Sequence, residues 1–324
     1  MWTTLILFFI ILFTYIHLQH QLKTGEDMEV YEYEYISAAG LQEITQYKQP
    51  VLFSLQLPSL RDNLHLDPIQ VKDIREYFKP DASSVDSISL SQTSGRGLMD
   101  TDSRSLFYSD RNQTSIAKSE KWTKWFETMD PFLQPAFTVY REYDVLYGSQ
   151  KTHTITMFHR ESHVYIYLPQ ETNPSPIRVK MTPWSSRTFL DHVSDYTYYE
   201  FWSKTNLFEK NNRIRCLDFI VKPGYVLYIP PYWFYSIEYQ NKTSEICMAK
   251  YTTGANLLAN VKHIGKYWLQ QQNIQEKWWK PLETRSVEEE KEEGKEEEDE
   301  IPPLDLSQNV VTVAEKLVSE IKKV

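Results

Sequence analysis

The residues best suited to chemistry lie in one stretch, THTITMFHRESHVYIYL, at residues 152–168. It carries His153, His159, Glu161 and His163 at odd-numbered positions. Side chains two residues apart point to the same face of a strand, so in a single strand these four would share one face. Imidazoles with a carboxylate can bind a transition metal. The alternative is that they form the solvent-exposed face of a strand whose other face is apolar.

A second stretch of interest is VKPGYVLYIPPYWFYSIEY at residues 221–239. The pattern predicts two strands joined by a Pro-Gly turn, followed by a Pro-Pro step and an aromatic cluster that includes Trp233 and Tyr235. A tyrosine stays protonated near neutral pH, and its hydroxyl needs a hydrogen-bond partner when it is buried. His159 and Glu161 are the candidates for that partner.

The elements around these residues are mainly β. Aromatic and β-branched residues in short alternating runs predict strands, and turn signals between short strands favour a sandwich or barrel over a parallel α/β sheet. The strands are expected at residues 137–140, 152–158, 163–168, 177–182, 225–229 and 246–252. Helices are expected at residues 38–48, partly at 67–80, at 119–129 and at 256–280.

Several of these segments carry a family resemblance. PGYVLYIPPYWFY at residues 223–235 resembles the closing motif Pro-Gly-Asp-x-Leu-x-x-Pro-x-x-Trp-Trp-His of the cupin-like JmjC domain family. ITQYKQPVLFSLQLP at residues 44–58 resembles the family's opening helix and strand, and DPFLQPAFTVYREYDVLYGS at 130–149 resembles the segment before the barrel. The resemblance covers roughly residues 35–270 and implies a double-stranded β-helix, a cupin or jelly-roll barrel, with flanking helices. The ending Tyr-Ser-Ile also resembles cupin-like proteins of large DNA viruses.

The resemblance implies an Fe(II)/2-oxoglutarate hydroxylase site, and this sequence departs from it. The family holds iron with His-x-Asp/Glu on an early strand and a late histidine, and Tyr235 stands at the position of that late histidine. His192 and His263 are weak candidates for a replacement third ligand. The basic residue that holds 2-oxoglutarate has no secure counterpart: Arg178 and Lys180 lie near its position, on an alternating strand that could simply face water.

Two alignments of the early strand stay open. In the first, Thr154 takes the family's threonine position and Met157-Phe158-His159 replaces the His-x-Asp pair. In the second, Thr156 takes that position and His159-Arg160-Glu161 supplies a His-x-Glu pair. Metal binding, if there is any, would then fall to His159 and Glu161.

The N-terminus reads MWTTLILFFIILFTYIHL, with an apolar run over residues 5–18. It has no basic flank before it and no small-x-small cleavage site, which favours a retained anchor over a removable signal peptide. Residues 1–20 are therefore expected to be a single-pass transmembrane anchor, followed by a cupin-like JmjC-type domain at 21–283. The charges that follow the run leave the orientation open.

The C-terminal end divides in two. Residues 288–300 contain ten acidic residues and two lysines, so residues 284–304 are expected to be a solvated acidic linker. Residues 305–324 predict a short amphipathic helix with an apolar stripe. Such a helix cannot bury its stripe alone and would dock on a protein partner, a membrane surface or its own domain.

Charge and cysteine content limit the classes of function. The net charge of -9 comes almost entirely from the acidic segment, and the body shows no basic stripe of the kind that binds nucleic acid. The two cysteines, Cys216 and Cys247, fall in apolar strands and read as small core residues, with a disulfide as the alternative. Asn112 and Asn241 begin glycosylation sequons.

Taken together, the sequence favours a single-pass, membrane-anchored, cupin-like protein without catalysis, with a structural or protein-interaction role at a host or virion membrane. No cofactor is expected under this interpretation, and a homodimer is an open alternative. An anchored Fe(II)/2-oxoglutarate hydroxylase with an atypical metal site is the second hypothesis. The third is a metal-free barrel that binds a small ligand among its aromatic residues, with Tyr235, Trp233, Thr154, Thr156, Arg178 and Lys180 as pocket candidates.

Overall fold

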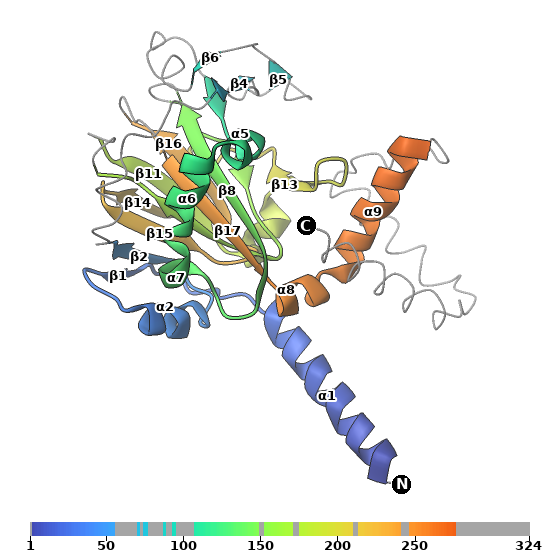
Figure 1. The fold of residues 1–324 in the computed structure, drawn as a ribbon. Coiled ribbons are helices and arrows are strands. Elements are labelled where there is room, and N and C mark those ends of the chain that lie inside the picture. The colour runs from blue at the N-terminus through green and yellow to red at the C-terminus, as the bar shows by residue number, and fades with distance from the viewer. Residues whose placement is uncertain are drawn as a thin grey trace. The chain divides into compact units, whose positions relative to one another are not determined.

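Two β-sheets pack face to face, and helices cover the outer face of the larger one (Figure 1). The computed structural model describes residues 2–55, 107–148, 152–170, 175–209, 213–240 and 246–276, together with four short strands between residues 70 and 94. The predicted mainly β architecture with flanking helices and an apolar N-terminal helix is confirmed. The chain divides into two units, Met1–Thr284 and Arg285–Val324, and the described residues all belong to the first. The acidic linker and amphipathic helix expected at 284–324 lie outside the part of the chain described.

The larger sheet has nine strands among the described residues and is almost wholly antiparallel. Its one parallel pair among them is β1 with β2. In order across the sheet the strands are β1 (Tyr31–Tyr33), β2 (Val51–Ser54), β15 (Tyr225–Ile229), β10 (Ser162–Tyr167), β17 (Ile246–Thr253), β8 (Thr138–Gly148), β7 (Phe107–Ser109), β4 (Ile74–Glu76) and β5 (Ser87–Ile88).

The smaller sheet has six strands among the residues described, all antiparallel. In order they are β12 (His192–Asp195), β13 (Glu200–Ser203), β9 (Thr156–Met157), β16 (Phe234–Tyr239), β11 (Ile177–Thr182) and β14 (Leu217–Val221). A separate pair joins β3 (Gln70–Val71) and β6 (Thr93–Ser94).

The central strands of the larger sheet are apolar on both faces, which explains the layers. Alternate residues of a strand point to opposite faces. On β17, Ile246 and Met248 join the core between the two sheets, whereas Cys247, Ala249 and Tyr251 join the core under the helices. A sheet with two apolar faces needs a cover on each side.

Short helices form the cover on the outer face. Ser37 and Ser119 cap two of them by accepting hydrogen bonds from the amides of Gly40 and Trp122. The helix expected at 119–129 is confirmed as α6, and its Trp122, Trp125 and Phe126 are all buried against the sheet. Not all helices belong to this cover. Among the described residues the helices are α1 (Trp2–Leu22), α2 (Ala38–Thr45), α5 (Gln113–Lys118), α6 (Glu120–Glu127), α7 (Asp130–Leu133), the 3-10 helix η1 (Trp184–Phe189), α8 (Gly254–Ala259) and α9 (Val261–Glu276).

Residues 152–168 contain two strands in the expected order, β9 and β10, but the chain leaves the smaller sheet after β9 and enters the larger sheet at β10, so the alternative of one shared face along residues 153–163 is wrong. The partly helical segment expected at 67–80 contains β3 and β4 instead, and β4 extends the larger sheet by pairing with β7. Pairing with a neighbouring strand here overrides local helix propensity.

The N-terminal helix α1 is long and apolar enough to span a membrane, and none of its residues is buried in the protein. Its C-terminal end is tied to the domain by Lys48. The Lys48 ammonium donates to the carbonyl oxygens of His20, Gln21 and Lys23 at 2.5, 2.8 and 2.7 Å. Carbonyls at a helix C-terminus lack intrahelical partners, and a cation there also opposes the negative end of the helix dipole.

The backbone conformation at Lys48 directs its side chain toward the C-terminal end of α1. Helix α2 ends just before it, and Lys48 adopts a left-handed backbone conformation with a φ of 54°. A left-handed residue is a common way to end a helix and reverse the chain. Burial, with a smaller contribution from Lys23, lowers the pKa of Lys48 to about 8.

Cys216 and Cys247 are both free, so the disulfide alternative is wrong. Cys247 lies in the core under the helices and Cys216 is half-buried at the edge of the smaller sheet.

A buried carboxylate links the helical cover to the sheet. Asp130, on α7, accepts a hydrogen bond from the Tyr251 hydroxyl on β17 at 2.7 Å. Its second oxygen accepts from Arg141 and from the Tyr143 hydroxyl, both on β8, at 2.5 and 2.6 Å. One side chain therefore holds α7 against two strands.

We expect Asp130→Ala to destabilise the protein by about 2–4 kcal/mol, because it leaves the buried Tyr251 hydroxyl and the partly buried Tyr143 hydroxyl without their acceptor, whereas the half-exposed Arg141 can turn to water. Tyr251→Phe, which removes only one partner, should cost about 1 kcal/mol. Unfolding of the detergent-solubilised full chain measures both, with the exposed Glu127→Ala as control. An Asp130→Ala effect no larger than that of Glu127→Ala would show that the link is not stabilising.

Candidate functional site

A hydrogen-bonded pair, His159 and Tyr235, lies between the two sheets. Tyr235 is only 2% exposed, and in the sheet it stands opposite Met157 of β9. Its hydroxyl lies 3.0 Å from Nε2 of His159 and 4.0 Å from Sδ of Met248. The prediction that this hydroxyl has a partner is confirmed, and of the two candidates the partner is His159.

Both members of the pair are neutral at pH 7. Burial lowers the pKa of His159 well below its usual value, and the charge of Lys250 acts in the same direction. Burial raises the pKa of Tyr235, with a smaller opposing effect from Lys250. The contact therefore joins a phenol to an uncharged imidazole.

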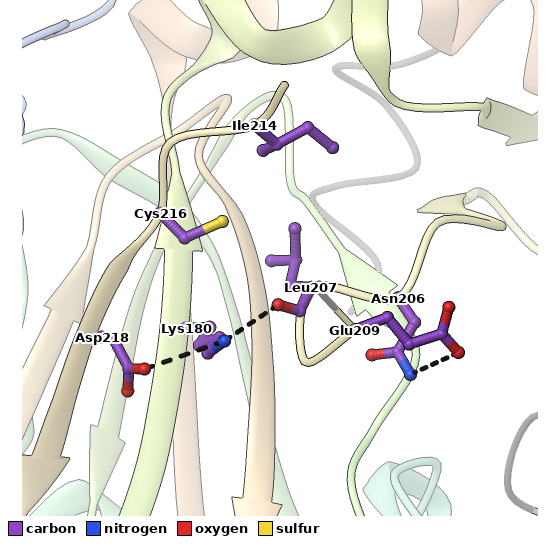
Figure 2. Close-up of a pocket in the computed structure, with 7 residues that line it drawn as sticks. All are labelled: Lys180, Asn206, Leu207, Glu209, Ile214, Cys216 and Asp218. Carbon is purple, nitrogen blue, oxygen red and sulfur yellow. Dashed lines mark hydrogen bonds and ion pairs between the residues drawn. The ribbon is translucent and has the colours of Figure 1, made fainter. Parts of the chain in front are cut away.

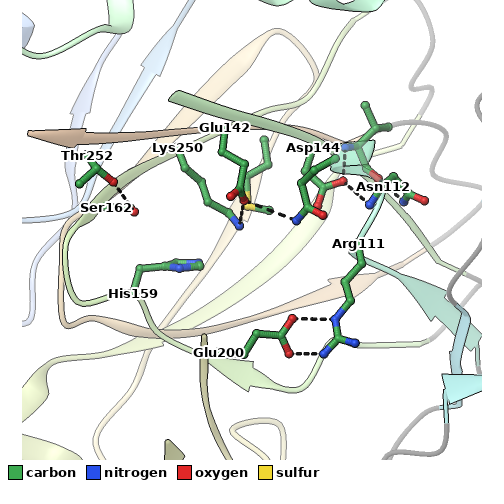
Figure 3. Close-up of polar contacts among 12 residues, drawn as sticks. Arg111, Asn112, Glu142, Asp144, His159, Ser162, Glu200, Lys250 and Thr252 are labelled. Atoms are coloured by element: carbon green, nitrogen blue, oxygen red, sulfur yellow. Dashed lines mark hydrogen bonds and ion pairs between the residues drawn. The ribbon is translucent and has the colours of Figure 1, made fainter. Parts of the chain in front are cut away.

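A charged group beside this pair was not predicted from the sequence. The Lys250 ammonium on β17 donates to Oε1 of Glu142 on β8 at 2.5 Å (Figure 3). Burial alone would lower the pKa of Lys250, but Glu142, Asp144 and Tyr235 together raise it, so the ammonium stays charged. We call Glu142, Asp144, His159, Tyr235 and Lys250 the inner cluster.

Asp144 is the most enclosed member of the inner cluster. Its Oδ1 accepts from the backbone amides of Asn112 at 2.9 Å and Val145 at 2.8 Å. Burial raises the pKa of Asp144 well above its usual value, against a lowering effect of Lys250. The Asn112 side chain is also buried and donates to the Val145 carbonyl at 2.7 Å, so this sequon is inaccessible in the folded chain. Asn241 lies outside the described residues.

A signal in the sequence could have revealed Lys250. In ICMAKYTT, positions 246, 248, 250 and 252 share one face, and the first two are apolar core residues. A lysine that continues an inward apolar face is buried unless the strand ends first. Glu142 and Asp144 continue the face of Leu146 on β8 in the same way.

The remaining histidines of the proposed metal patch lie apart from the pair. His153 packs against Phe208, with ring centroids 4.8 Å apart. His163 is hydrogen-bonded through Nδ1 to the Tyr228 hydroxyl at 2.8 Å and through Nε2 to Asn256 at 3.0 Å. The hypothesis of one shared metal-binding face is therefore wrong, because residues 153–163 span two sheets.

Glu161 and the two late histidines do not complete a metal site. Burial raises the pKa of Glu161 to about 7, while the Tyr199 hydroxyl and Arg160 act to lower it. His263 is bonded to the Tyr196 hydroxyl at 2.8 Å, and the His192 ring packs against Phe158 and Trp184. Within the described residues, no three His, Cys, Asp or Glu side chains converge in a way that could hold a metal ion.

Arg178 and Lys180 point away from the inner cluster, which corrects their assignment to a central pocket. On β11, Ile177, Val179 and Met181 face the core between the sheets, so the two basic residues between them face outward. Arg178 forms a bidentate ion pair with Asp218 at 2.7 and 2.6 Å.

Lys180 donates to the Leu207 carbonyl at 3.2 Å and lines a pocket of about 250 Å³ on the outer side of the smaller sheet (Figure 2). The pocket is lined by Lys180, Asn206, Leu207, Glu209, Ile214, Cys216 and Asp218. Its acidic residues already pair with Lys180 and Asn206.

The other pocket candidates have structural contacts. The Thr154 hydroxyl accepts from the Ile237 amide at 3.0 Å, and the Thr156 hydroxyl donates to the Thr205 carbonyl at 2.7 Å. Trp233 is fully buried in the core between the sheets. These three residues hold strands together.

Comparison with models of protein families gives no match, and comparison with curated proteins gives no match either.

The buried carboxyl of Glu161 makes stability depend on pH. A carboxyl whose folded pKa is raised contributes stability below its unfolded pKa of 4.5, and that contribution is lost as the pH rises through about 7. We expect Glu161→Gln to be near neutral at pH 5 and to stabilise the protein by ~1–3 kcal/mol at pH 8. Unfolding at both pH values measures the difference, and the exposed Glu127→Gln is the control. An equal effect of Glu161→Gln at both pH values would contradict the shift.

Proposed function

We propose that this protein is a membrane-anchored, cupin-like domain without catalysis, which acts as a structural or protein-interaction module. The observation that carries the proposal is the neutral His159–Tyr235 hydrogen bond, which lies where the family resemblance would put the iron of a cupin-like oxygenase. The resemblance of residues 223–235 to the family's closing motif locates that position.

The order of strands supports a double-stranded β-helix. Four pairs are nested about the connection between β11 and β14, namely β11 with β14, β10 with β15, β9 with β16 and β8 with β17. From β8 to β11 and again from β14 to β17, successive strands alternate between the two sheets. Two further antiparallel pairings, β10 with β17 and β11 with β16, join strands of successive nested pairs within each sheet. A long antiparallel hairpin rolled into two facing sheets has this pattern, as in a jelly roll.

The donor atoms at this position do not fit Fe(II). A non-heme iron site of this type uses two histidines and one carboxylate. Here Met157 lies opposite Tyr235 in the sheet and His159 bonds to it, so a thioether, a phenol and one neutral imidazole stand together. This geometry favours the alignment in which Met157-Phe158-His159 replaces His-x-Asp. The Lys250 charge nearby also opposes a cation.

The position for 2-oxoglutarate is also altered. The inward face of β11 offers Val179 and Met181, and the basic residues Arg178 and Lys180 pair with Asp218 on the outside. An apolar wall cannot balance the charge of a dicarboxylate. The inward cation that remains, Lys250, is already paired with Glu142, so the hydroxylase hypothesis gains no support from these positions.

Helix α1 supports the membrane part of the proposal. Its 21 residues correspond to ~31 Å of helix, of which the apolar run of residues 5–18 makes up ~21 Å, so α1 can cross a ~30 Å hydrocarbon core with its polar ends near the two interfaces. Its C-terminal carbonyls are held by Lys48, so a bilayer that contains α1 lies directly against the domain. The amphipathic helix expected at 305–324 is proposed to bind the partner, and a virion or virus-modified membrane is proposed from the family resemblance.

Restoration of the iron ligands tests the assignment of the site. We expect the triple variant Met157→His, His159→Asp, Tyr235→His to bind about one Co(II) or Fe(II) per chain, because it supplies a facial triad. The unaltered chain should retain none in anaerobic elemental analysis with 2-oxoglutarate. Stoichiometric iron in the unaltered chain, lost in His159→Ala, would overturn the proposal in favour of the hydroxylase.

Charges placed in α1 test the anchor. The unaltered chain should resist extraction from membranes by alkaline carbonate and keep its full mass. The variant Ile10→Lys, Ile11→Lys should be extracted, since each lysine at the helix centre costs roughly 2.5–3.5 kcal/mol. Tyr198→Lys, at an exposed site of the domain, is the control. A shortened chain in the soluble fraction would instead identify residues 1–20 as a signal peptide.

A further inference from the structure

Exposed apolar residues surround the point where α1 leaves the domain. We call them the exit surface: Tyr47, Phe137, Val139, Leu258 and Val261. They come from four places in the chain, namely the turn after α2, the start of β8, the end of α8 and the start of α9, so the apolar character of this surface is created by the fold.

Contacts place these residues beside the end of α1. Tyr47 precedes Lys48, which holds the last carbonyls of α1. Leu258 lies on α8, which packs next to the C-terminal end of α1 (Figure 1). The Phe137 carbonyl accepts from the Gly254 amide at the start of α8 at 3.1 Å, and Val261 begins α9, with only Asn260 between it and α8.

Phe137 is unusual in two independent ways. Its side chain is 90% exposed, and its backbone lies in the left-handed region with a φ of 59°. The left-handed conformation is unfavourable for a bulky residue, and an exposed phenyl ring gains nothing in water. Both costs are explained if the ring has an apolar environment outside the chain.

The length of the apolar run in α1 indicates that environment. Residues 5–18 form 14 residues of helix, or ~21 Å, which is shorter than a ~30 Å hydrocarbon core. A short run draws its flanking residues toward the bilayer. The flank at the C-terminal end of α1 is the exit surface.

We propose that the exit surface is a second, shallow membrane contact, in which Phe137 and Leu258 insert into the interfacial layer of the lipid leaflet where α1 ends. This inference rests on the proposed anchoring by α1. Lys48 lies at the level of the headgroups, and its three hydrogen bonds keep the angle between helix and domain fixed. The domain is then held against the membrane in one orientation.

Photo-crosslinking of the full chain tests the contact. p-Benzoylphenylalanine replaces Phe137 or, in a second protein, Leu258, and each protein is reconstituted in phosphatidylcholine vesicles that contain an alkyne-bearing phosphatidylcholine. The control carries the same group in place of Tyr198, which is 66% exposed and lies against Arg111. Lipid adducts should be roughly tenfold more abundant at 137 and 258 than at 198, because a residue in bulk water meets lipid only in collisions.

The outcomes separate this inference from the anchor. Carbonate-resistant protein with equal lipid labelling at all three positions, or with none at 137 and 258, overturns the contact and leaves the anchor intact. Adducts between two chains in place of lipid adducts would identify the exit surface as a dimer interface and overturn it too. Extraction of the protein by carbonate would overturn the anchor, and with it the contact.

Discussion

The burial of both faces of one sheet is the constraint on which the rest of the structure depends. Strands β15, β10, β17 and β8 present apolar side chains alternately to the helices and to the smaller sheet. Neither face can be left in water, so the chain must supply a helical layer and a second sheet. Asp130 then joins the helical layer to β8 and β17 through hydrogen bonds from three side chains.

The same constraint explains the inner cluster. Polar residues that continue an inward apolar face are carried between the sheets, where each needs a partner. Lys250 has Glu142, and His159 has Tyr235. A buried ion pair contributes little net stability, but the loss of one partner is costly, so such groups tend to fix one arrangement of the strands. Polar groups that pair with one another between the sheets agree with the proposed structural role of the domain.

The two ends of the protein differ in how they are connected to the domain. At the N-terminal end, three hydrogen bonds from Lys48 and the packing of α8 hold α1 in place. At the C-terminal end, the sequence predicts a charged linker before the last helix. In our proposal, the first connection fixes the domain at the membrane and the second lets residues 305–324 search for a partner.

The sequence by itself determined the elements whose periodicity is strong. Helix α6 and the alternating strand β11 follow from periodicity, because each keeps one core-facing side along its length, whereas the N-terminal helix follows from its uniformly apolar composition. A hydrogen-bond partner for Tyr235 could also be predicted from the sequence, since a buried hydroxyl requires one. The tertiary structure alone decided that β9 and β10 join different sheets, because local alternation predicts a strand but not its neighbours. It also brought Lys250 to Glu142 and set Phe137 beside α8, since residues so far apart in sequence meet only when long-range strand pairing has fixed the register.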